Sequence, residues 1–348
     1  MLALDWQHPP ATVENAPAVS GAVGVKRTPV CEHSTVGGFV SRDNSPMGQA
    51  HRFKLDGKVL AASLQEITLT LSSPVIGAEG VPLAVDAYGR DGSWVVLLHG
   101  GGQTRHSWKR SALAIAAGGF RTLAYDARGH GDSGWSPTGD YALARLEEDL
   151  AAIAMRLDGP LALVGASMGG LTALLAAGTF LSERVAALVL VDIAISPTKA
   201  GSARILEFME SNPDGFADIE EVVASLTRYN PLRPRSSDTR GLERNLRRGP
   251  DGRLRWHWDP ALMKTGPRLG RGDFTQRLNA AAPGVTAPTL LIRGAASDVV
   301  DAEGLEEMRR LLPHIRVSEA HGASHMVAGD RNDRFMADVL PFLTAAMG

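Results

Sequence analysis

Hydrophobic positions divide the chain into an irregular N-terminal stretch and a regular remainder. In residues 1–62, prolines are scattered among Gly, Ser and Val, and apolar residues keep neither the two-residue period of a strand nor the 3.6-residue period of a helix. Because such a segment gains little from burial, we expect residues 1–62 to form a loosely ordered extension. The fold is expected to begin at about residue 63.

From residue 67 onward, short apolar or alternating runs predict strands, and longer amphipathic runs predict helices. The predicted strands cover residues 67–71, 81–88, 94–98, 121–125, 161–164, 186–191, 289–293 and 315–317. The predicted helices between and after them cover residues 108–117, 141–157, 168–180, 302–312 and 333–346. Alternation of strands and helices is typical of a doubly wound α/β protein. The pattern therefore predicts a mostly parallel, eight-stranded sheet covered by helices.

Residues 196–283 interrupt this alternation. Two helical runs are followed there by Pro- and Trp-containing sequence rather than by a strand. We expect a helical cap inserted after the sixth strand, which leaves residues 63–195 and 284–348 as the core. Residues 228–255 are strongly basic, with nine arginines against three acidic residues. This favours a solvated, salt-bridged surface, with attraction of an anionic substrate as the alternative.

Composition narrows the class of protein without identifying it. Hydrophobic residues make up 44% and charged residues 21% of the 348 positions, as in an ordinary globular protein. The net charge of −2 gives no general attraction to nucleic acid or acidic membranes, and no run approaches the ~18 apolar residues of a membrane span. Cys31 is the only cysteine, and the N-terminus lacks the pattern of a secretory signal. We therefore expect a cytoplasmic protein without nucleic-acid or membrane partners, and the oligomeric state stays open.

The strongest chemical signal lies between the predicted strand at 161–164 and the predicted helix at 168–180. The sequence Gly165-Ala166-Ser167-Met168-Gly169 matches the G-x-S-x-G pattern of a sharp strand-to-helix turn. Glycines on either side of the serine let the strand and the helix pack closely around it. Such a turn places the Ser167 hydroxyl at the positive end of the helix, where an oxyanion is stabilised. Ser167 is therefore the candidate nucleophile.

Two backbone N–H groups are expected to stabilise an oxyanion next to this serine. The sequence His99-Gly100-Gly101-Gly102-Gln103 follows the predicted strand at 94–98, and its three glycines let the backbone approach a ligand closely. We assign Gly101 N–H as the first donor and Met168 N–H, directly after the nucleophile, as the second. His99 opens the loop and is expected to fix its shape by hydrogen bonding rather than to act as a base.

A carboxylate is needed to orient a catalytic histidine, and three aspartates lie close to predicted strand ends. Asp298 lies in the middle of the loop after the strand at 289–293, and we expect it to be the orienting acid. Asp301 directly precedes the next helix, which is typical of an N-cap. Asp192 directly follows the strand at 186–191 and is the reserve candidate.

The candidate general base is His325. It lies in a glycine-containing loop after the last predicted strand and ahead of the terminal helix, which gives the order serine, aspartate, histidine along the chain. His321 adjoins the strand end and leaves less loop with which to reach Ser167. The other histidines considered are interpreted as structural or substrate-lining, and no histidine-carboxylate group has the spacing of a zinc site. These histidines are His106, His130 and His257.

Taken together, these motifs resemble the α/β-hydrolase superfamily over about residues 65–347. The resemblance rests on stretches in the family's order, namely His99 to Gly102, Asp126 to Ser133, Gly165 to Gly170, Asp298 and Gly322 to Met326. In that family the stretch from Asp126 to Ser133 flanks the site, and the insertion after the sixth core strand is a lid over it. The N-terminal extension is not part of the family's pattern.

A serine at the elbow implies acyl transfer, whereas epoxide hydrolases and haloalkane dehalogenases with this layout use an aspartate there. The resemblance implies a serine hydrolase that cleaves a small-molecule carboxylic ester or lactone, with Ser167, His325 and Asp298 as the triad and with no cofactor or metal. Carbon-carbon bond hydrolases and cofactor-free haloperoxidases share such triads. A ligand receptor with a slow or vestigial triad, or an enzyme that transfers the acyl group to an acceptor other than water, would keep the same residues.

Overall fold

A computed structural model of the chain describes residues 68–69, 74–230, 240–265, 273–325 and 332–348. The expected extension at residues 1–62 lies outside the described residues. All elements below belong to the described part of the chain.

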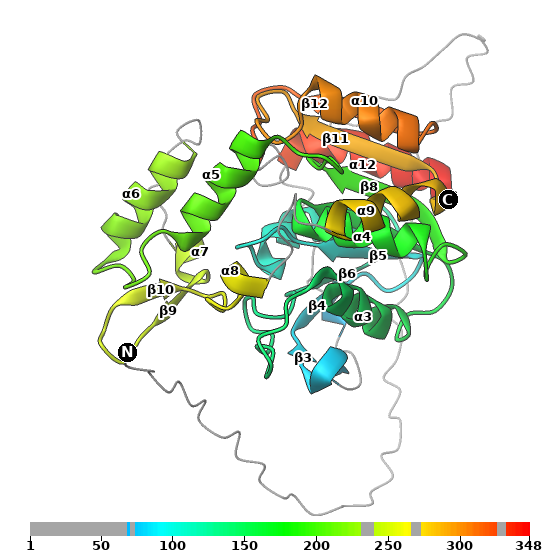
Figure 1. Cartoon of the computed structure of the whole chain (residues 1–348). Coiled ribbons are helices and arrows are strands. Elements are labelled where there is room, and N and C mark those ends of the chain that lie inside the picture. The colour runs from blue at the N-terminus through cyan, green and yellow to red at the C-terminus, as the bar shows by residue number, and fades with distance from the viewer. Residues whose placement is uncertain (1–67, 70–73, 231–239, 266–272, 326–331) are drawn as a thin grey trace, which may run out of the picture. The chain divides into compact units, whose positions relative to one another are not determined.

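A single eight-stranded sheet forms the centre of the described structure (Figure 1). Its order across the sheet is β1-β4-β6-β5-β7-β8-β11-β12. The strands are β1 (Thr68–Leu69), β4 (Val85–Tyr88), β5 (Trp94–Leu98), β6 (Arg121–Tyr125), β7 (Leu161–Ala166), β8 (Val185–Val191), β11 (Thr289–Gly294) and β12 (Arg316–Ala320). A separate antiparallel pair, β2 (Val75–Ile76) and β3 (Pro82–Leu83), flanks the short helix η1 (Ala78–Gly80).

The sheet is parallel from β6 to β12 and antiparallel only where β1 meets β4 and β4 meets β6. The prediction of a doubly wound, mostly parallel, eight-stranded sheet is confirmed. The central strand β5 is buried along its whole length, as its uniformly apolar sequence Trp-Val-Val-Leu-Leu requires. Parallel strands of this kind end at one edge of the sheet, and loops at that edge can form a common site.

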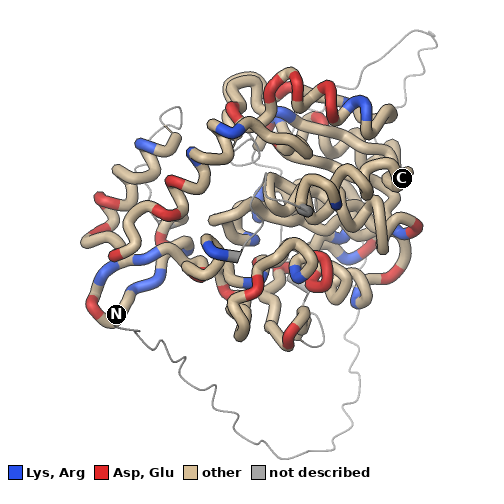
Figure 2. The backbone as a smooth tube through the Cα atoms, viewed as in Figure 1, with Lys and Arg blue, Asp and Glu red and all other residues tan. Residues whose placement is uncertain are grey.

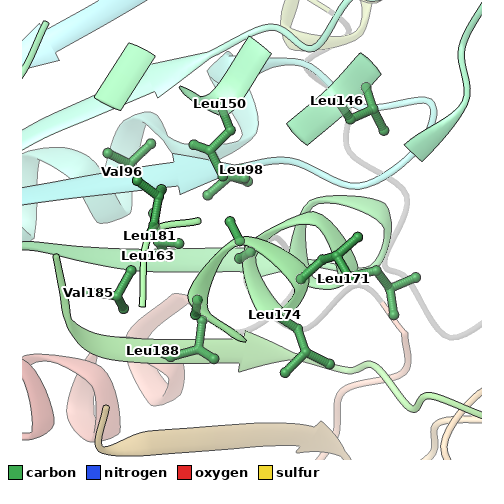
Figure 3. Close-up of a cluster of buried hydrophobic side chains, with 14 of the residues drawn as sticks. Val96, Leu98, Leu146, Leu150, Leu163, Leu171, Leu174, Leu181, Val185 and Leu188 are labelled. Atoms are coloured by element: carbon green, nitrogen blue, oxygen red, sulfur yellow. The ribbon is translucent and has the colours of Figure 1, made fainter. Parts of the chain in front are cut away.

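Helices cover both faces of the sheet (Figure 1). On one face, α4 (Met168–Gly178) and α3 (Leu143–Ala154) pack on the central strands, together with α9 (Asp273–Ala281) and α10 (Ala302–Leu311). Figure 3 shows leucines of α3 and α4 against Val96, Leu98, Leu163 and Leu188 of the sheet. On the other face lie α2 (Lys109–Ala117), preceded by η2 (Arg105–Trp108), and α12 (Asn332–Met347).

The insertion follows β8, the sixth strand of the sheet along the chain, as predicted. It contains α5 (Lys199–Glu210), α6 (Ile219–Tyr229), α7 (Arg240–Glu243), β9 (Leu246–Arg248), β10 (Leu254–Trp256) and α8 (Leu262–Thr265). We call these elements, residues 199–265, the cap. Helix α9 and the short helix η3 (Ala282–Gly284), which the sequence grouped with the cap, instead pack with the core: Phe274 and Leu278 are buried in the same cluster as α4.

None of the helices in the described ranges is both long enough and apolar enough to cross a membrane.

Candidate active site

Ser167 stands between β7 and α4 in strained backbone. Its φ of 46° and ψ of −119° lie in a region of backbone conformation that residues other than glycine rarely adopt. The flanking glycines make this turn possible: a Cβ at Gly165 would lie 2.4 Å from Gly169 O, and a Cβ at Gly169 would lie 2.4 Å from Leu98 O. The G-x-S-x-G sequence therefore forms the sharp strand-to-helix turn that its pattern predicts.

Asp192 follows β8 directly and is completely buried. Its backbone is left-handed, with φ 51°, a conformation that aspartate tolerates better than most residues. One carboxylate oxygen accepts a hydrogen bond of 2.8 Å from Gly294 N–H, and the other accepts one of 2.6 Å from the Ser297 hydroxyl. These donors come from the last residue of β11 and from the loop that follows it, and they compensate a buried charge that would otherwise be costly.

His325 contacts the same carboxylate, with 2.8 Å between Nδ1 and Asp192 Oδ2. Because a carboxylate can only accept, Nδ1 carries the proton and Nε2 keeps its lone pair. Strands β7 and β8 are in register at Ala166 and Val191, and Ser167 N–H donates to Val191 O at 3.1 Å. Ser167 and Asp192 therefore follow neighbouring strand ends, and His325 is held by Asp192 at that edge of the sheet.

The expectation that Asp298 orients His325 is corrected by this geometry. Asp298 forms an ion pair of 2.7 Å with Arg204 of α5, and its side chain is 41% exposed. The loop after β11 turns Ser297 inward to Asp192, and the next residue, Asp298, faces the cap. Asp301 caps α10 by accepting a hydrogen bond from Gly304 N–H at 2.8 Å, as predicted.

The loop that follows β5 lies against the nucleophile: a Cβ built on Gly100 would lie 3.3 Å from Ser167 Cβ. Two of its glycine N–H groups are already bonded, Gly100 N–H to Gln103 Oε1 and Gly102 N–H to His130 Nε2, each at 3.1 Å. Among the described residues, Gly101 N–H has no acceptor. The Met168 N–H is at the first position of α4, where no helical carbonyl can reach it. Within the described part of the chain, these two groups remain available to a ligand.

His99 has the structural role that its position suggests. Its Nδ1 lies 2.8 Å from Gly100 O, and its Nε2 accepts a hydrogen bond of 2.9 Å from Ala127 N–H. Both ring nitrogens are thus engaged with backbone, and burial lowers the pKa of this imidazole. His106 lies 3.7 Å from the Asp86 carboxylate, and His321 is exposed just beyond β12. Neither takes the place of His325 at Asp192.

Apolar cap side chains lie over the loop after β5, a feature that sequence analysis missed. A Cβ on Gly101 would lie 3.6 Å from Met209 Sδ, and a Cβ on Gly102 would lie 3.2 Å from the Trp258 ring. Trp258 stacks on Trp256 with 5.0 Å between ring centroids. The available signal was the sequence Trp-His-Trp, an unusually aromatic run within a basic segment.

Basic residues line the cap hairpin β9–β10 (Figure 2). Of its arginines, Arg247 donates to Gly131 O of the core, and the others bond within the cap. Arg253 donates to the carbonyl oxygens of Asp214 and Gly215 at 2.9 and 2.8 Å. Arg255 forms an ion pair of 2.7 Å with Asp251. These contacts fit the expected salt-bridged surface better than a site for an anion. Arg233 and Arg235 lie outside the described residues.

The fold and the serine elbow define an α/β hydrolase, and comparison with known families agrees. The profile described as "alpha/beta hydrolase fold" matches residues 93–331, so the chain belongs to this family. The match covers the elbow, both strand-end aspartates and His325.

Individual relatives span much of the chain. An esterase of Mycobacterium tuberculosis, Rv0045c, is 30% identical over 248 residues, which are 68% of this chain and 78% of the esterase. The non-heme chloroperoxidase CPO-A1 of Kitasatospora aureofaciens is 30% identical over 286 residues, 76% of this chain and 97% of the relative. The crystal structure of E-2-(acetamidomethylene)succinate hydrolase superposes with a TM-score of 0.70 at 25% identity, covering 80% of this chain and 99% of that one.

Proposed function

We propose that the protein is a serine hydrolase that cleaves a carboxylic ester or lactone through an acyl-enzyme on Ser167. The observation that carries the proposal is the buried Asp192–His325 pair at the strand end next to Ser167. The similarity to a mycobacterial esterase supports an ester as the substrate. The lone Cys31 suits a reducing compartment such as the cytoplasm.

In this reaction His325 Nε2 takes the Ser167 proton while Ser167 Oγ attacks the ester carbonyl carbon. The N–H groups of Gly101 and Met168 bond the oxyanion of the tetrahedral intermediate. Collapse of the intermediate expels the alcohol, which takes the proton from His325 and leaves an acyl group on Ser167. Water then attacks the acyl group with His325 again as base, and the carboxylic acid departs. Asp192 holds the Nδ1–H tautomer and stabilises the imidazolium.

The group next to the scissile carbonyl is proposed to be apolar. Met209 and Trp258 lie against Gly101 and Gly102, and burial of apolar substrate surface there is favourable. An anionic substrate is less well supported, since Arg253 and Arg255 are bonded within the cap.

Replacement of the nucleophile tests the function directly. Ser167→Ala should leave the melting temperature within a few degrees and lower kcat for p-nitrophenyl butyrate by about 10⁴-fold or more, because an interdependent triad loses its nucleophile. Steady-state hydrolysis of wild type and variant, with thermal unfolding as the control for folding, checks this. Equal activity of the two proteins would remove Ser167 from the mechanism.

Cofactor-free haloperoxidation is the second candidate, favoured by the similarity to a non-heme chloroperoxidase over 76% of the chain. Hydrogen peroxide in place of water would attack the same acyl-enzyme and release a peracid, the species that oxidises halide. Competition between water and hydrogen peroxide for the acyl-enzyme, measured as the ratio of carboxylic acid to peracid, separates the two functions.

A further inference from the structure

Three buried imidazoles form a row behind the loop after β5. The ring centroids of His99 and His130 are 5.1 Å apart, and those of His130 and His257 are 5.8 Å apart. His99 belongs to the loop itself, His130 to the loop after β6, and His257 to the cap just after β10. The row therefore links three segments that are far apart in the sequence.

The backbone partners of His130 and His257 define which ring nitrogen carries the proton. His130 Nδ1 donates to Arg128 O at 3.1 Å, and its Nε2 accepts from Gly102 N–H at 3.1 Å. His257 Nδ1 accepts from Gly131 N–H at 2.7 Å, and its Nε2 faces Gly102 O at 3.4 Å as a donor. Each ring thus has one nitrogen directed to Gly102 and the other to the segment 128–131.

The rings are neutral when they make these contacts. Burial lowers the pKa of His130 well below its ordinary value, and burial lowers that of His257 to about 4. Because both nitrogens of each ring are used by backbone groups, neither ring has a free lone pair for a metal or for a substrate proton. The contacts of His130 and His257 therefore suit these two residues to hold backbone groups in place rather than to take part in the chemical reaction.

The backbone that they hold is the residue after Gly101. Gly102 donates its N–H to His130, its carbonyl oxygen faces His257, and a Cβ built on it would lie 3.2 Å from the Trp258 ring. The His130 contact holds the Gly101–Gly102 peptide, and the His257 contact holds the Gly102–Gln103 peptide.

The Gly101 N–H belongs to the preceding peptide, whose Gly100 O contacts His99 Nδ1 and accepts from Gln103 N–H. The two histidines therefore act on the Gly101 N–H through the Gly101 Cα, which joins these neighbouring peptides. An oxyanion donor must be held to within a few tenths of an ångström, since a shift of about 1 Å can cost 100-fold in rate.

We propose that His130 and His257 are positioning residues that fix the peptides on either side of Gly102 and thereby prevent the rotation at Gly101 that would turn its N–H away from the oxyanion hole. The proposal rests on the proposed serine hydrolase function and adds a role for the cap: the core presents the nucleophile, and the cap completes the support of the oxyanion donor. Other contacts fasten this part of the cap to the core. Asp259 N–H donates to Gly129 O at 2.9 Å, and the Tyr141 hydroxyl donates to Asp259 at 2.5 Å.

A pair of substitutions at each histidine separates positioning from folding. A glutamine places its amide near the Nε2 position of the imidazole, and an asparagine places it near the Nδ1 position. His130→Gln and His257→Gln therefore keep the contact with Gly102, whereas His130→Asn and His257→Asn keep only the contact with the segment 128–131. His314→Gln is the control, because His314 contacts Ala287 O at the opposite edge of the sheet.

Steady-state kinetics with p-nitrophenyl butyrate and thermal unfolding are measured on wild type and all five variants. We expect both asparagine variants to lose about 10- to 100-fold in kcat with KM changed less than about 3-fold, because the oxyanion is bound in the transition state and not in the ground state. Both glutamine variants and His314→Gln should stay within about 3-fold of wild-type kcat. The melting temperatures of the five variants should not rank in the same order as their kcat values.

Three results would overturn the proposal. The asparagine and glutamine variants could fall equally in kcat, the asparagine variants could match wild type, or the loss could appear in KM alone. If wild type hydrolyses esters in any of these cases, only the positioning role fails. A wild type that neither turns over an ester nor is labelled at Ser167 by a phosphonate would overturn the serine hydrolase function and the positioning role together.

Discussion

The loops after β8 and β11 each present an aspartate at the same edge of the sheet, and the two aspartates have opposite environments. Asp192 is fully buried and accepts hydrogen bonds from Gly294 N–H and the Ser297 hydroxyl. Asp298 is 41% exposed and is paired with Arg204. The difference indicates that proximity to a strand end does not by itself suit a carboxylate to the proposed role of catalytic acid: the fold buries the charge of Asp192 among hydrogen-bond donors and leaves that of Asp298 at the surface.

The loop after β11 still contributes to the candidate triad, although its aspartate does not. It supplies the Ser297 hydroxyl to Asp192, next to the Gly294 N–H at the end of β11, and it directs Asp298 to the cap helix α5. One loop therefore supports the acid, and the neighbouring strand end provides it. Four predictions follow in order of expected effect, and three of them test this division of roles.

The largest effect is expected from the acid itself. Asp192→Asn should lower kcat by about 10³- to 10⁴-fold, because an amide facing His325 favours the wrong imidazole tautomer. Asp298→Asn is the matched control and should change kcat by less than about 3-fold. Steady-state hydrolysis by the two variants decides between the loops, and the reverse ranking would restore Asp298 as the acid.

A smaller effect, on stability, is expected when the pH is lowered, and it comes from the buried histidines. Unlike His325, these histidines have both ring nitrogens bound to backbone groups. Burial lowers the pKa of His99, His130 and His257, the last to about 4, whereas an unfolded histidine titrates near its ordinary value of 6.5. Between these values the unfolded chain binds more protons, so the free energy of unfolding should fall as the pH falls below about 6.5. For His257 alone the loss is on the order of 3 kcal/mol at pH 4.

Urea unfolding between pH 7.5 and 4.5 measures this loss. His257→Gln should flatten the dependence on pH, since its amide does not titrate. A free energy of unfolding that stays constant from pH 7.5 to 4.5 in wild type would contradict the neutral, buried state of the three rings.

A loss of about tenfold in kcat is expected when the donor from the loop after β11 is removed. Ser297→Ala takes away a hydrogen bond to the Asp192 carboxylate, and such bonds to charged groups are worth about 1.5–3 kcal/mol. Ser297→Thr keeps the hydroxyl and should recover most of the activity. Kinetics of the two variants test the supporting role, which is refuted if alanine and threonine behave alike.

The smallest effect is expected at the exposed ion pair. Arg204→Gln removes a partner of Asp298, and because both side chains are more than a third exposed, the pair should contribute less than about 1 kcal/mol. The melting temperature should fall by no more than a few degrees, with kcat within about 3-fold of wild type. A large loss of kcat in Arg204→Gln would contradict this expectation, and it would show that the part of the loop after β11 that contains Asp298 contributes to catalysis.

Much of the core follows from local pattern. The strands at 94–98 and 121–125 have the predicted bounds, and the elbow at Ser167 forms because its flanking glycines alone fit there. The strand predicted at 81–88 is divided into β3 and β4 in the structure. His325 follows Ser167 and Asp192 along the chain, which keeps the predicted order of serine, aspartate and histidine.

The contacts that distinguish Asp192 from Asp298 are not local. They depend on the side to which the loop after β11 turns, where Thr198 and Arg204 bond to Asp298 and Ser297 bonds to Asp192. The cap hairpin β9–β10 was also missed, although Pro250-Asp251-Gly252 between two short runs is a turn signal. Arginines on both strands of this hairpin obscured the alternation of apolar and polar residues by which a strand is recognised in a sequence. Likewise, nothing near His257 in the sequence indicates that it contacts Gly102.

The measurement that tests the central claim most directly is the site of covalent labelling by a serine-directed phosphonate. Ser167 lies in the tryptic peptide 157–184, which also contains Thr172, Thr179 and Ser182, so fragment ions must locate the adduct. The account predicts one adduct, on Ser167, in wild type and none in Ser167→Ala. An adduct on another residue, or no adduct on a wild-type protein that hydrolyses esters, would contradict Ser167 as the nucleophile.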